Sequence, residues 1–283
     1  AVTALLTVQQ HVVFPSSPLA SFGLPSARDA YNAPLEGIEG SVFVVGEPTS
    51  AGSPEVWGET LLANTWFLND AKVANVYTPV GFDAYSERLC MNNRGETCAQ
   101  ALDALFSPVG DGELMLVDAM QINSIQIITP PVDRDTALSP RPGWSVVSEE
   151  TFSVTWVREN PVELPGGVVM TSSGVELSGV ESSESTVAFK VEAVAESGQS
   201  TVTFSRLAWP GYTTSAGQLT DPLDGMLLTL DLQGVQAGEV VEVSFAPPGW
   251  GAVRLLLVGS IVVVVAMQVT RWWSRRRIKQ GQV

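Results

Sequence analysis

In the stretch Val187–Ala193, VAFKVEA, the apolar residues Val187, Phe189, Val191 and Ala193 alternate with Ala188, Lys190 and Glu192. Because successive side chains of a strand point to opposite faces, this pattern is typical of a strand with one buried and one solvated face. The same period of two recurs at residues 152–157, 201–205, 226–232 and 241–245, and Gly, Pro, Ser and Asp residues separate the segments. Together they predict an antiparallel, jelly-roll-like β-sandwich over residues 131–251.

The region before this sandwich, residues 41–130, mixes short apolar strands with helical periods. Ser41–Gly46 (SVFVVG) and Ile122–Ile128 are rich in β-branched residues and predict strands. Trp57–Asn69 and Glu96–Phe106 carry apolar side chains at helical spacing. This region therefore predicts a small α/β unit, and the fold class of the whole chain is α+β.

Residues 1–40 have a different character from both of these regions. The chain begins at Ala1 without an initiator Met, and Pro, Ser, Gly and Ala dominate residues 15–40. We expect an irregular leader or the end of a preceding membrane helix, with a mature N-terminus after signal cleavage as the alternative. His11 is the single histidine, which argues against a Ser–His–Asp triad or a multi-His zinc site.

Beyond the sandwich, Ala252–Thr270 reads AVRLLLVGSIVVVVAMQVT and carries one charge, at Arg254. At about 1.5 Å per residue this run crosses a hydrocarbon core of about 30 Å. Arg254 can reach the outer headgroups, while Trp272 and Trp273 suit the other interface. A buried core helix is the alternative, which the basic flank disfavours. We predict a transmembrane helix over residues 252–271 and a basic tail over residues 272–283.

Charge is strongly segregated along the 283 residues, which carry a net charge of −15. No acid occurs from Ala252 onward, where six of the 15 Lys and Arg residues lie, so residues 1–251 carry a net charge of −21. The positive-inside rule predicts a cytoplasmic tail and an extracytoplasmic region of residues 1–251 at the plasma membrane. An acidic domain of this kind argues against nucleic acid as a partner.

Cys90 and Cys98 enclose a short loop, CMNNRGETC. An extracytoplasmic compartment permits a disulfide between them, which would stabilise the fold by about 2.5 kcal/mol in the chain-entropy model. Two free core thiols are one alternative. A metal site is the other, although no third soft ligand lies nearby in the sequence.

Three stretches resemble segments of YfhO-type bacterial membrane proteins. Leu116–Ile128 (LVDAMQINSIQII) is similar to their leucine-aspartate, short helix and strand, and Trp156–Gly167 (WVRENPVELPGG) to their strand with Asn-Pro and Leu-Pro turns. Phe204–Gly217 (FSRLAWPGYTTSAG), with Gly238–Pro247 (GEVVEVSFAP), resembles their aromatic-Pro-Gly-aromatic hairpin and closing strand before the last membrane helix. The resemblance covers roughly residues 41–270.

Such proteins resemble the GT-C class of multi-pass glycosyltransferases, which use lipid-linked sugar donors at the outer membrane face. The phrases LLANTWFLND, NVYTPVGFDAY and SRLAWPGY look like actinobacterial versions. The resemblance implies a membrane bundle ahead of this region, with the catalytic acid in an early extracytoplasmic loop. This chain departs from that pattern because it has one predicted span, so no residue here is assigned as catalytic.

Six aromatic residues lie beside Gly, Pro, Asn and Asp, a mixture typical of sugar-binding loops. An aromatic ring can stack on the C–H face of a sugar while polar neighbours bind its hydroxyls. These candidate glycan-binding residues are Trp57, Trp66, Tyr77, Tyr85, Trp209 and Tyr212. Packing is the alternative, in a helix core for Trp66 and at a hairpin corner for Trp209 and Tyr212.

Carboxylates could supply an acid pair for glycosyl chemistry or ligands for calcium. The candidates for an acid pair are Glu59, Asp70, Asp83, Glu87 and Asp118, although Asp118 better suits capping the turn that follows it. Asp133 with Asp135, and Asp221 with Asp224, offer oxygen ligands but match no known calcium loop. We predict no cofactor, with calcium as the alternative.

These features predict a membrane-anchored, extracytoplasmic portion of a cell-envelope glycosyltransferase, which binds glycan or caps the active site. Its partners would be the bilayer, a glycan or polyprenyl-linked sugar, and other membrane subunits. The alternative is a non-enzymatic, anchored binding or assembly subunit of a cell-envelope complex. A self-sufficient anchored hydrolase is disfavoured because no nucleophile–base pair is evident.

Overall fold

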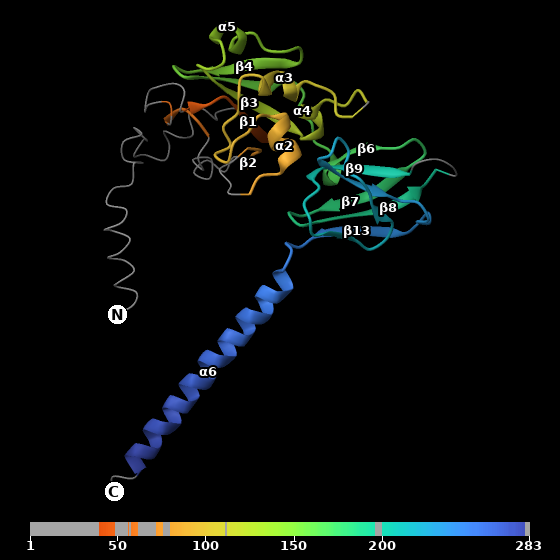
Figure 1. Cartoon of the computed structure of the whole chain (residues 1–283). Coiled ribbons are helices and arrows are strands. Elements are labelled where there is room, and N and C mark those ends of the chain that lie inside the picture. The colour runs from red at the N-terminus through yellow and green to blue at the C-terminus, as the bar shows by residue number, and fades with distance from the viewer. Residues whose placement is uncertain are drawn as a thin grey trace.

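The computed structural model describes residues 40–48, 56, 58–61, 72–75, 80–110, 112–195 and 200–280, with side chains up to residue 270. Its strands form one mixed sheet and two antiparallel sheets, and a long helix leads away from this head (Figure 1). The predicted α+β class with a sandwich is therefore confirmed. Residues 1–39 of the leader, and most of the predicted helix Trp57–Asn69, lie outside the described residues.

The mixed sheet has the strand order β2-β1-β3-β5-β4. Strand β1 runs parallel to β2 and β3, whereas β3, β5 and β4 are antiparallel neighbours. The strands are β1 (Ser41–Val45), β2 (Lys72–Val73), β3 (Ile122–Ile128), β4 (Trp144–Glu149) and β5 (Ser153–Arg158). Strands β4 and β5 both lie within residues 131–251, which we expected to form the sandwich, yet they belong to the mixed sheet with β3. A period of two marks a strand without specifying its sheet.

Short helices cover one face of the mixed sheet. They are α2 (Asp83–Arg88), α3 (Ala101–Leu105), α4 (Leu116–Ala119) and α5 (Arg134–Ala137). The core beneath them contains Phe43 and Trp156, both fully buried. On the opposite face, Leu61 packs with Val44. Burial on both faces explains why β1 is apolar without alternation. Strand β3 is also buried on both faces, and its polar side chains Asn123 and Gln126 are hydrogen-bonded to backbone groups.

Helix α3 is shorter than the predicted Glu96–Phe106 because the residues before it are bound to the end of β1. The Thr97 hydroxyl accepts a hydrogen bond from the Gly46 amide (3.0 Å), and the Thr97 amide donates to the Gly46 carbonyl (3.2 Å). The Asn75 side chain bonds to both the amide and the carbonyl of Val44 (2.8 and 2.7 Å). These contacts hold the loop that contains Cys98 against the carboxyl end of β1.

Two four-stranded sheets, with orders β10-β13-β8-β7 and β11-β12-β9-β6, form the sandwich. After the one-turn helix η7 (Pro165–Gly167) come β6 (Val168–Thr171), β7 (Glu176–Ser182), β8 (Thr186–Ala193), β9 (Thr201–Leu207), β10 (Tyr212–Thr214), β11 (Gln218–Leu219), β12 (Leu227–Asp231) and β13 (Val240–Phe245). Strand β8 pairs with β13 in one sheet and β9 with β12 in the other, with β10 and β11 between them in the chain. This nested pairing is jelly-roll-like.

The sandwich core consists of the alternate residues that the sequence pattern marks as inward-facing. Phe189 of β8 and Phe204 of β9 are fully buried, with ring centroids 6.1 Å apart. Val187 and Val191 of β8 are also buried, whereas Lys190 between them is exposed. The alternation thus separates the core from the solvated face as predicted.

The mixed sheet and the sandwich meet at a packed junction. Met226 and Leu227 at the start of β12 belong to the same apolar core as α2. Arg88 of α2 forms an ion pair with Asp224 of the sandwich and donates to the Ser107 hydroxyl (2.8 Å). The mixed sheet and the sandwich therefore share a buried interface and are not separate domains joined by a linker.

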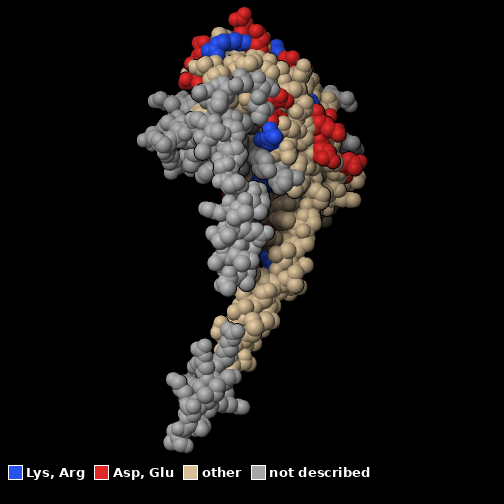
Figure 2. Space-filling model, turned by 60° about the vertical axis from the view of Figure 1, so that its left-hand side comes forward, with Lys and Arg blue, Asp and Glu red and all other residues tan. Residues whose placement is uncertain are grey.

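Helix α6 (Trp250–Gln280) leaves the head directly after β13 (Figure 1). Its segment Trp250–Thr270 is long and apolar enough to cross a membrane and is wholly exposed. Figure 2 shows this helix projecting below the head as a largely uncharged surface. The exposure excludes the alternative of a buried core helix and agrees with the predicted transmembrane segment.

Candidate functional site

The aromatic candidates are not gathered into one site within the described residues. Trp57, Trp66 and Tyr77 lie outside those residues. Tyr85 on α2 is 3% exposed among the apolar side chains of the main core, and burial raises the pKa of its phenol. The Tyr85 ring is therefore a packing element and cannot stack on a sugar.

Trp209 and Tyr212 flank a sharp corner between β9 and β10, as the packing alternative predicted. The Trp209 ring meets Phe82 edge to face, with centroids 5.2 Å apart. The Tyr212 ring lies 4.9 Å from that of Phe245 on β13. Both residues remain half-buried, so each ring keeps a partly accessible surface.

Cys90 and Cys98 form a disulfide, which confirms the predicted pairing; their Cα atoms are 5.7 Å apart. Within the enclosed loop, the Asn92 side-chain amide donates to the Glu96 carboxylate (2.9 Å). Thr97 joins this loop to the end of β1. The disulfide thus ties the end of α2 to the carboxyl end of a central strand.

A hollow of about 510 Å³ opens at the carboxyl end of β3. Its lining consists of Thr129, Pro130, Pro131, Val132, Asp133, Arg134, Thr151 and Phe152. These residues come from the segment that follows β3 and from the turn between β4 and β5, so the hollow lies where β3 ends beside the start of β5. Of the residues that line the hollow, the sequence had singled out only Asp133, as a candidate calcium ligand.

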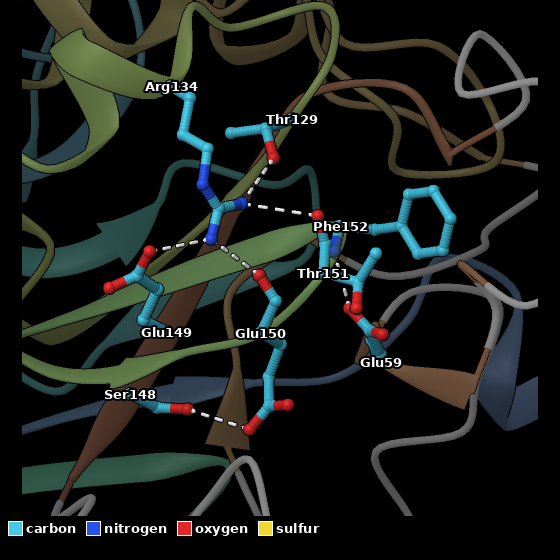
Figure 3. Close-up of polar contacts among 8 residues, drawn as sticks. All are labelled: Glu59, Thr129, Arg134, Ser148, Glu149, Glu150, Thr151 and Phe152. Atoms are coloured by element: carbon cyan, nitrogen blue, oxygen red, sulfur yellow. Dashed lines mark hydrogen bonds and ion pairs between the residues drawn. The ribbon is translucent and has the colours of Figure 1, made fainter.

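Arg134 organises one wall of the hollow (Figure 3). Its Nη1 donates to the Thr151 carbonyl (3.1 Å) and the Thr129 hydroxyl (3.4 Å). Its Nη2 donates to the Glu149 carboxylate (2.8 Å) and the Glu150 carbonyl (2.9 Å). The guanidinium therefore holds the β4–β5 turn and has little donor capacity left for a ligand.

Charge around the hollow disfavours an anionic ligand. Asp133 lines it, and Asp135, Glu149 and Glu150 are nearby in the chain, with Arg134 as the one lining cation among the described residues. The Pro rings and Phe152 add apolar surface, while Thr129 and Thr151 carry hydroxyls. The hollow is thus suited to a neutral or amine-bearing polar ligand with C–H faces.

Glu59 lies beside this wall, on the segment that covers the open face of the mixed sheet. Its carboxylate accepts a hydrogen bond from the Phe152 amide (2.6 Å). Burial raises the pKa of Glu59 from its ordinary value of 4.5, and the nearby charge of Glu150 acts in the same direction. The ionised form of this side chain therefore costs stability in the folded state.

We predict that Glu59→Gln raises stability at pH 7 and changes it little at pH 4. A raised folded-state pKa means that the wild-type carboxyl favours folding when protonated and loses that advantage as pH rises past it. The glutamine oxygen can still accept from Phe152, and the gain should stay below about 1 kcal/mol because the site is partly exposed. Urea unfolding of the detergent-solubilised protein at both pH values measures it. Glu87→Gln, at an exposed position of α2, controls for the lost charge; an equal effect in both variants would contradict the prediction.

The other acids serve structural roles or lie in exposed positions. Asp118 pairs with Arg158 (2.7 Å), so our expectation that it caps a turn is wrong. Arg158 in turn stacks over the Trp144 ring at 4.7 Å, which makes Asp118 part of the junction between α4 and the sheet. Asp83 and Glu87 are exposed on α2, and Asp70 lies outside the described residues.

The calcium alternative gains no support from the geometry of its acids. Asp133 caps α5 by accepting hydrogen bonds from the Thr136 amide (3.0 Å) and hydroxyl (3.2 Å). Asp224 is paired with Arg88. Within the described part of the chain, no three His, Cys, Asp or Glu side chains gather as a metal site requires.

Comparison with known proteins adds no assignment. The chain matches no protein-family model, no curated protein and no solved structure. Its function must therefore be inferred from the placement of its own residues.

Proposed function

We propose that this chain is the extracytoplasmic, membrane-anchored part of a bacterial cell-envelope glycosyltransferase of the GT-C type, and that it binds glycan or caps the active site. The placement of the head carries this proposal. Strand β13 ends at Phe245 and α6 begins at Trp250, so the head stands directly on the membrane surface. A lipid-linked donor presents its sugar at that surface, within reach of a domain held there.

The proposed orientation follows from charge and covalent structure together. The six cations beyond Ala252 favour the cytoplasm, whereas residues 1–251 carry all 30 acids. The Cys90–Cys98 disulfide suits an oxidising, extracytoplasmic compartment. Both features support a head outside the cell.

The three stretches that resemble YfhO-type proteins lie together around one end of the mixed sheet, which supports a shared architecture. Asn123 and Val162, from the first two stretches, exchange two hydrogen bonds (2.8 and 3.2 Å). Gln121 accepts from the Leu164 amide (3.2 Å), and its amide nitrogen lies near Gly167 beside Ser205 of the third stretch. These residues join the mixed sheet to the sandwich, so the resembling segments form the structural junction between the two parts of the head. The proposed catalytic acid would lie outside this chain.

We place the glycan at the hollow beyond β3. The Pro rings and Phe152 of its lining offer C–H surface and the Thr hydroxyls offer hydrogen bonds, which suits an uncharged sugar chain, whereas Asp133 and the acids near it disfavour phosphate. Helix α5, which borders the hollow, lies at the end of the head opposite α6 (Figure 1). That position suits a growing acceptor glycan better than a donor whose lipid lies in the membrane.

A non-enzymatic, anchored assembly subunit is the second candidate function. It is favoured by the packing of the described aromatic candidates, since Tyr85 is buried and Trp209 rests on Phe82. In that case the head would bind another membrane protein and not a glycan.

The full chain in lipid nanodiscs, applied to an array of neutral oligosaccharides, tests the first function. We expect binding that Thr151→Trp abolishes, because the new ring fills the hollow, and that Ser139→Trp, in the exposed turn after α5, leaves unchanged. Absence of glycan binding, together with a stoichiometric multi-pass partner that copurifies from native membranes, would favour the assembly subunit.

A further inference from the structure

The corner Trp209–Tyr212 is bonded to Ala246, which lies at the start of the short connection to α6. The Ala246 amide donates to the Gly211 carbonyl (3.0 Å), and Tyr212 pairs in register with Phe245. Gly211 has φ +118°, and a Cβ there would lie 2.2 Å from the Ala246 carbonyl oxygen. Only glycine permits this approach, so the corner and the start of the connection to α6 move as one unit.

The connection to α6 is short enough to bring this corner to the membrane surface. The Trp250 amide donates to the Pro247 carbonyl (3.0 Å), which closes a four-residue turn with its ends within about 7 Å. With one further residue, Ala246 lies within about 11 Å of the first residue of the apolar span. The headgroup layer of one leaflet is itself about 5–7 Å thick. The corner therefore lies at or just above the headgroups whenever α6 spans the bilayer.

The side chains at this corner suit that position. Phe82, Trp209 and Tyr212 are half-buried, and Pro210 is exposed. Tryptophan and tyrosine concentrate at membrane–water interfaces because each joins an apolar ring to a polar group. The edge-to-face contact of Trp209 with Phe82 adds the start of α2 to the same apolar surface.

The corner also lies in a stretch of the chain without acidic residues. In a region with a net charge of −21, no Asp or Glu occurs between residues 197 and 220. Arg206 lies in this acid-free stretch and donates to the backbone carbonyls of Glu184 (2.9 Å) and Ser183 (2.6 Å). An anionic leaflet would therefore repel this surface less than the rest of the head. Asp83 and Glu184, both exposed, border it, which suits contact with headgroups and not insertion into hydrocarbon.

We propose that Phe82, Trp209, Pro210 and Tyr212 form a membrane-facing rim on which the head rests against the headgroups of the outer leaflet. This inference uses the membrane span and orientation of the proposed function, but not its glycan. It assigns Trp209 and Tyr212 to lipid, whereas the sequence had suggested sugar. The rim and the hollow then lie at opposite ends of the head, so the membrane holds the hollow facing away from the bilayer.

Fluorescence quenching in nanodiscs tests the rim. An environment-sensitive fluorophore is attached to Pro210→Cys in the otherwise native chain, with the Cys90–Cys98 disulfide kept oxidised. Ser139→Cys, in the turn after α5, serves as the distant control, and Ser260→Cys in the middle of α6 as the membrane control. Lipids that carry a nitroxide near the headgroup should quench the label at 210 at least threefold more than the label at 139.

Each outcome has a distinct meaning. If the label at 260 is quenched by deep nitroxides but the label at 210 behaves like that at 139, the proposed membrane-facing rim is contradicted and the transmembrane helix is supported. If the label at 260 is also unquenched, the span itself fails. Ser185→Cys provides a second rim-side position, since the Ser185 carbonyl accepts from the Phe245 amide (2.8 Å), should the change at Pro210 prevent folding. If the label at 210 responds to soluble glycan and not to lipid, the corner binds sugar and the proposed rim is contradicted.

Discussion

Trp156→Ala should lower the free energy of unfolding by about 3–5 kcal/mol, the range found for large aromatic deletions in packed cores. Trp156 is 1% exposed on β5, which lies between β3 and the edge strand β4 of the mixed sheet. Its indole Nε1 also donates to the Ala137 carbonyl (2.6 Å) at the end of α5. The substitution removes the ring and leaves that buried carbonyl without its donor.

Urea unfolding of the full chain in detergent, followed by far-UV circular dichroism, measures this loss. Val147→Ala, at the bulge of the edge strand β4, is the matched control because Val147 is 43% exposed. The control should change stability by less than about 1 kcal/mol. Equal losses in both variants would mean that Trp156 is not buried in this core.

Arg88→Ala should destabilise the junction between the mixed sheet and the sandwich by roughly 2–3 kcal/mol. The side chain of Arg88 is 18% exposed and pairs with Asp224, while it also donates to the hydroxyl and the carbonyl of Ser107. Burial lowers the pKa of Arg88 from its usual value, which reflects the cost of desolvating the charge. Without the guanidinium, Asp224 loses its ion-pair partner at the packed boundary, whereas the Ser107 carbonyl keeps the hydrogen bond from the Leu116 amide (3.0 Å).

A double-mutant cycle with Asp224→Ala separates the ion pair from the other contacts of Arg88. We expect the two losses to be less than additive, by about 1 kcal/mol or more. Arg141→Ala is the control, since Arg141 pairs with Asp103 at an exposed site where such a pair contributes little. Additive losses, or an Arg88 effect as small as that of Arg141, would show that the junction does not depend on this pair.

Much of the sheet structure could be predicted because its determinants are local. Strand β1 is a short apolar run, β3 is rich in β-branched residues, and β8, β9, β12 and β13 alternate with a period of two. The pairing partner of each strand could not be predicted in the same way. Strand β5 has the same alternation as the sandwich strands, yet it pairs with β3, and nothing within its own residues distinguishes those two outcomes.

The candidate site was less predictable, because it depends on residues far apart in the chain. The hollow combines residues 129–134 with Thr151 and Phe152, and Glu59 approaches it from a segment 93 residues away from Phe152. Aromatic residues in Gly- and Pro-rich surroundings were a poor guide to exposure. Tyr85 has such neighbours in the sequence, but α2 turns its ring into the core.

Composition and periodicity alone sufficed for the apolar C-terminal helix, the segregation of charge, the paired cysteines and the alternating strands of the sandwich. Each of these depends on properties of contiguous residues, namely hydrophobic length, charge count, loop size and the two-residue repeat of a strand. The sheet that β5 joins, the burial of Tyr85, the hollow beyond β3 and the closeness of the Trp209–Tyr212 corner to α6 required the tertiary structure. Those features arise where distant segments compete for the same buried surface and the same hydrogen-bonding edges, and such competition is settled only when the whole chain packs.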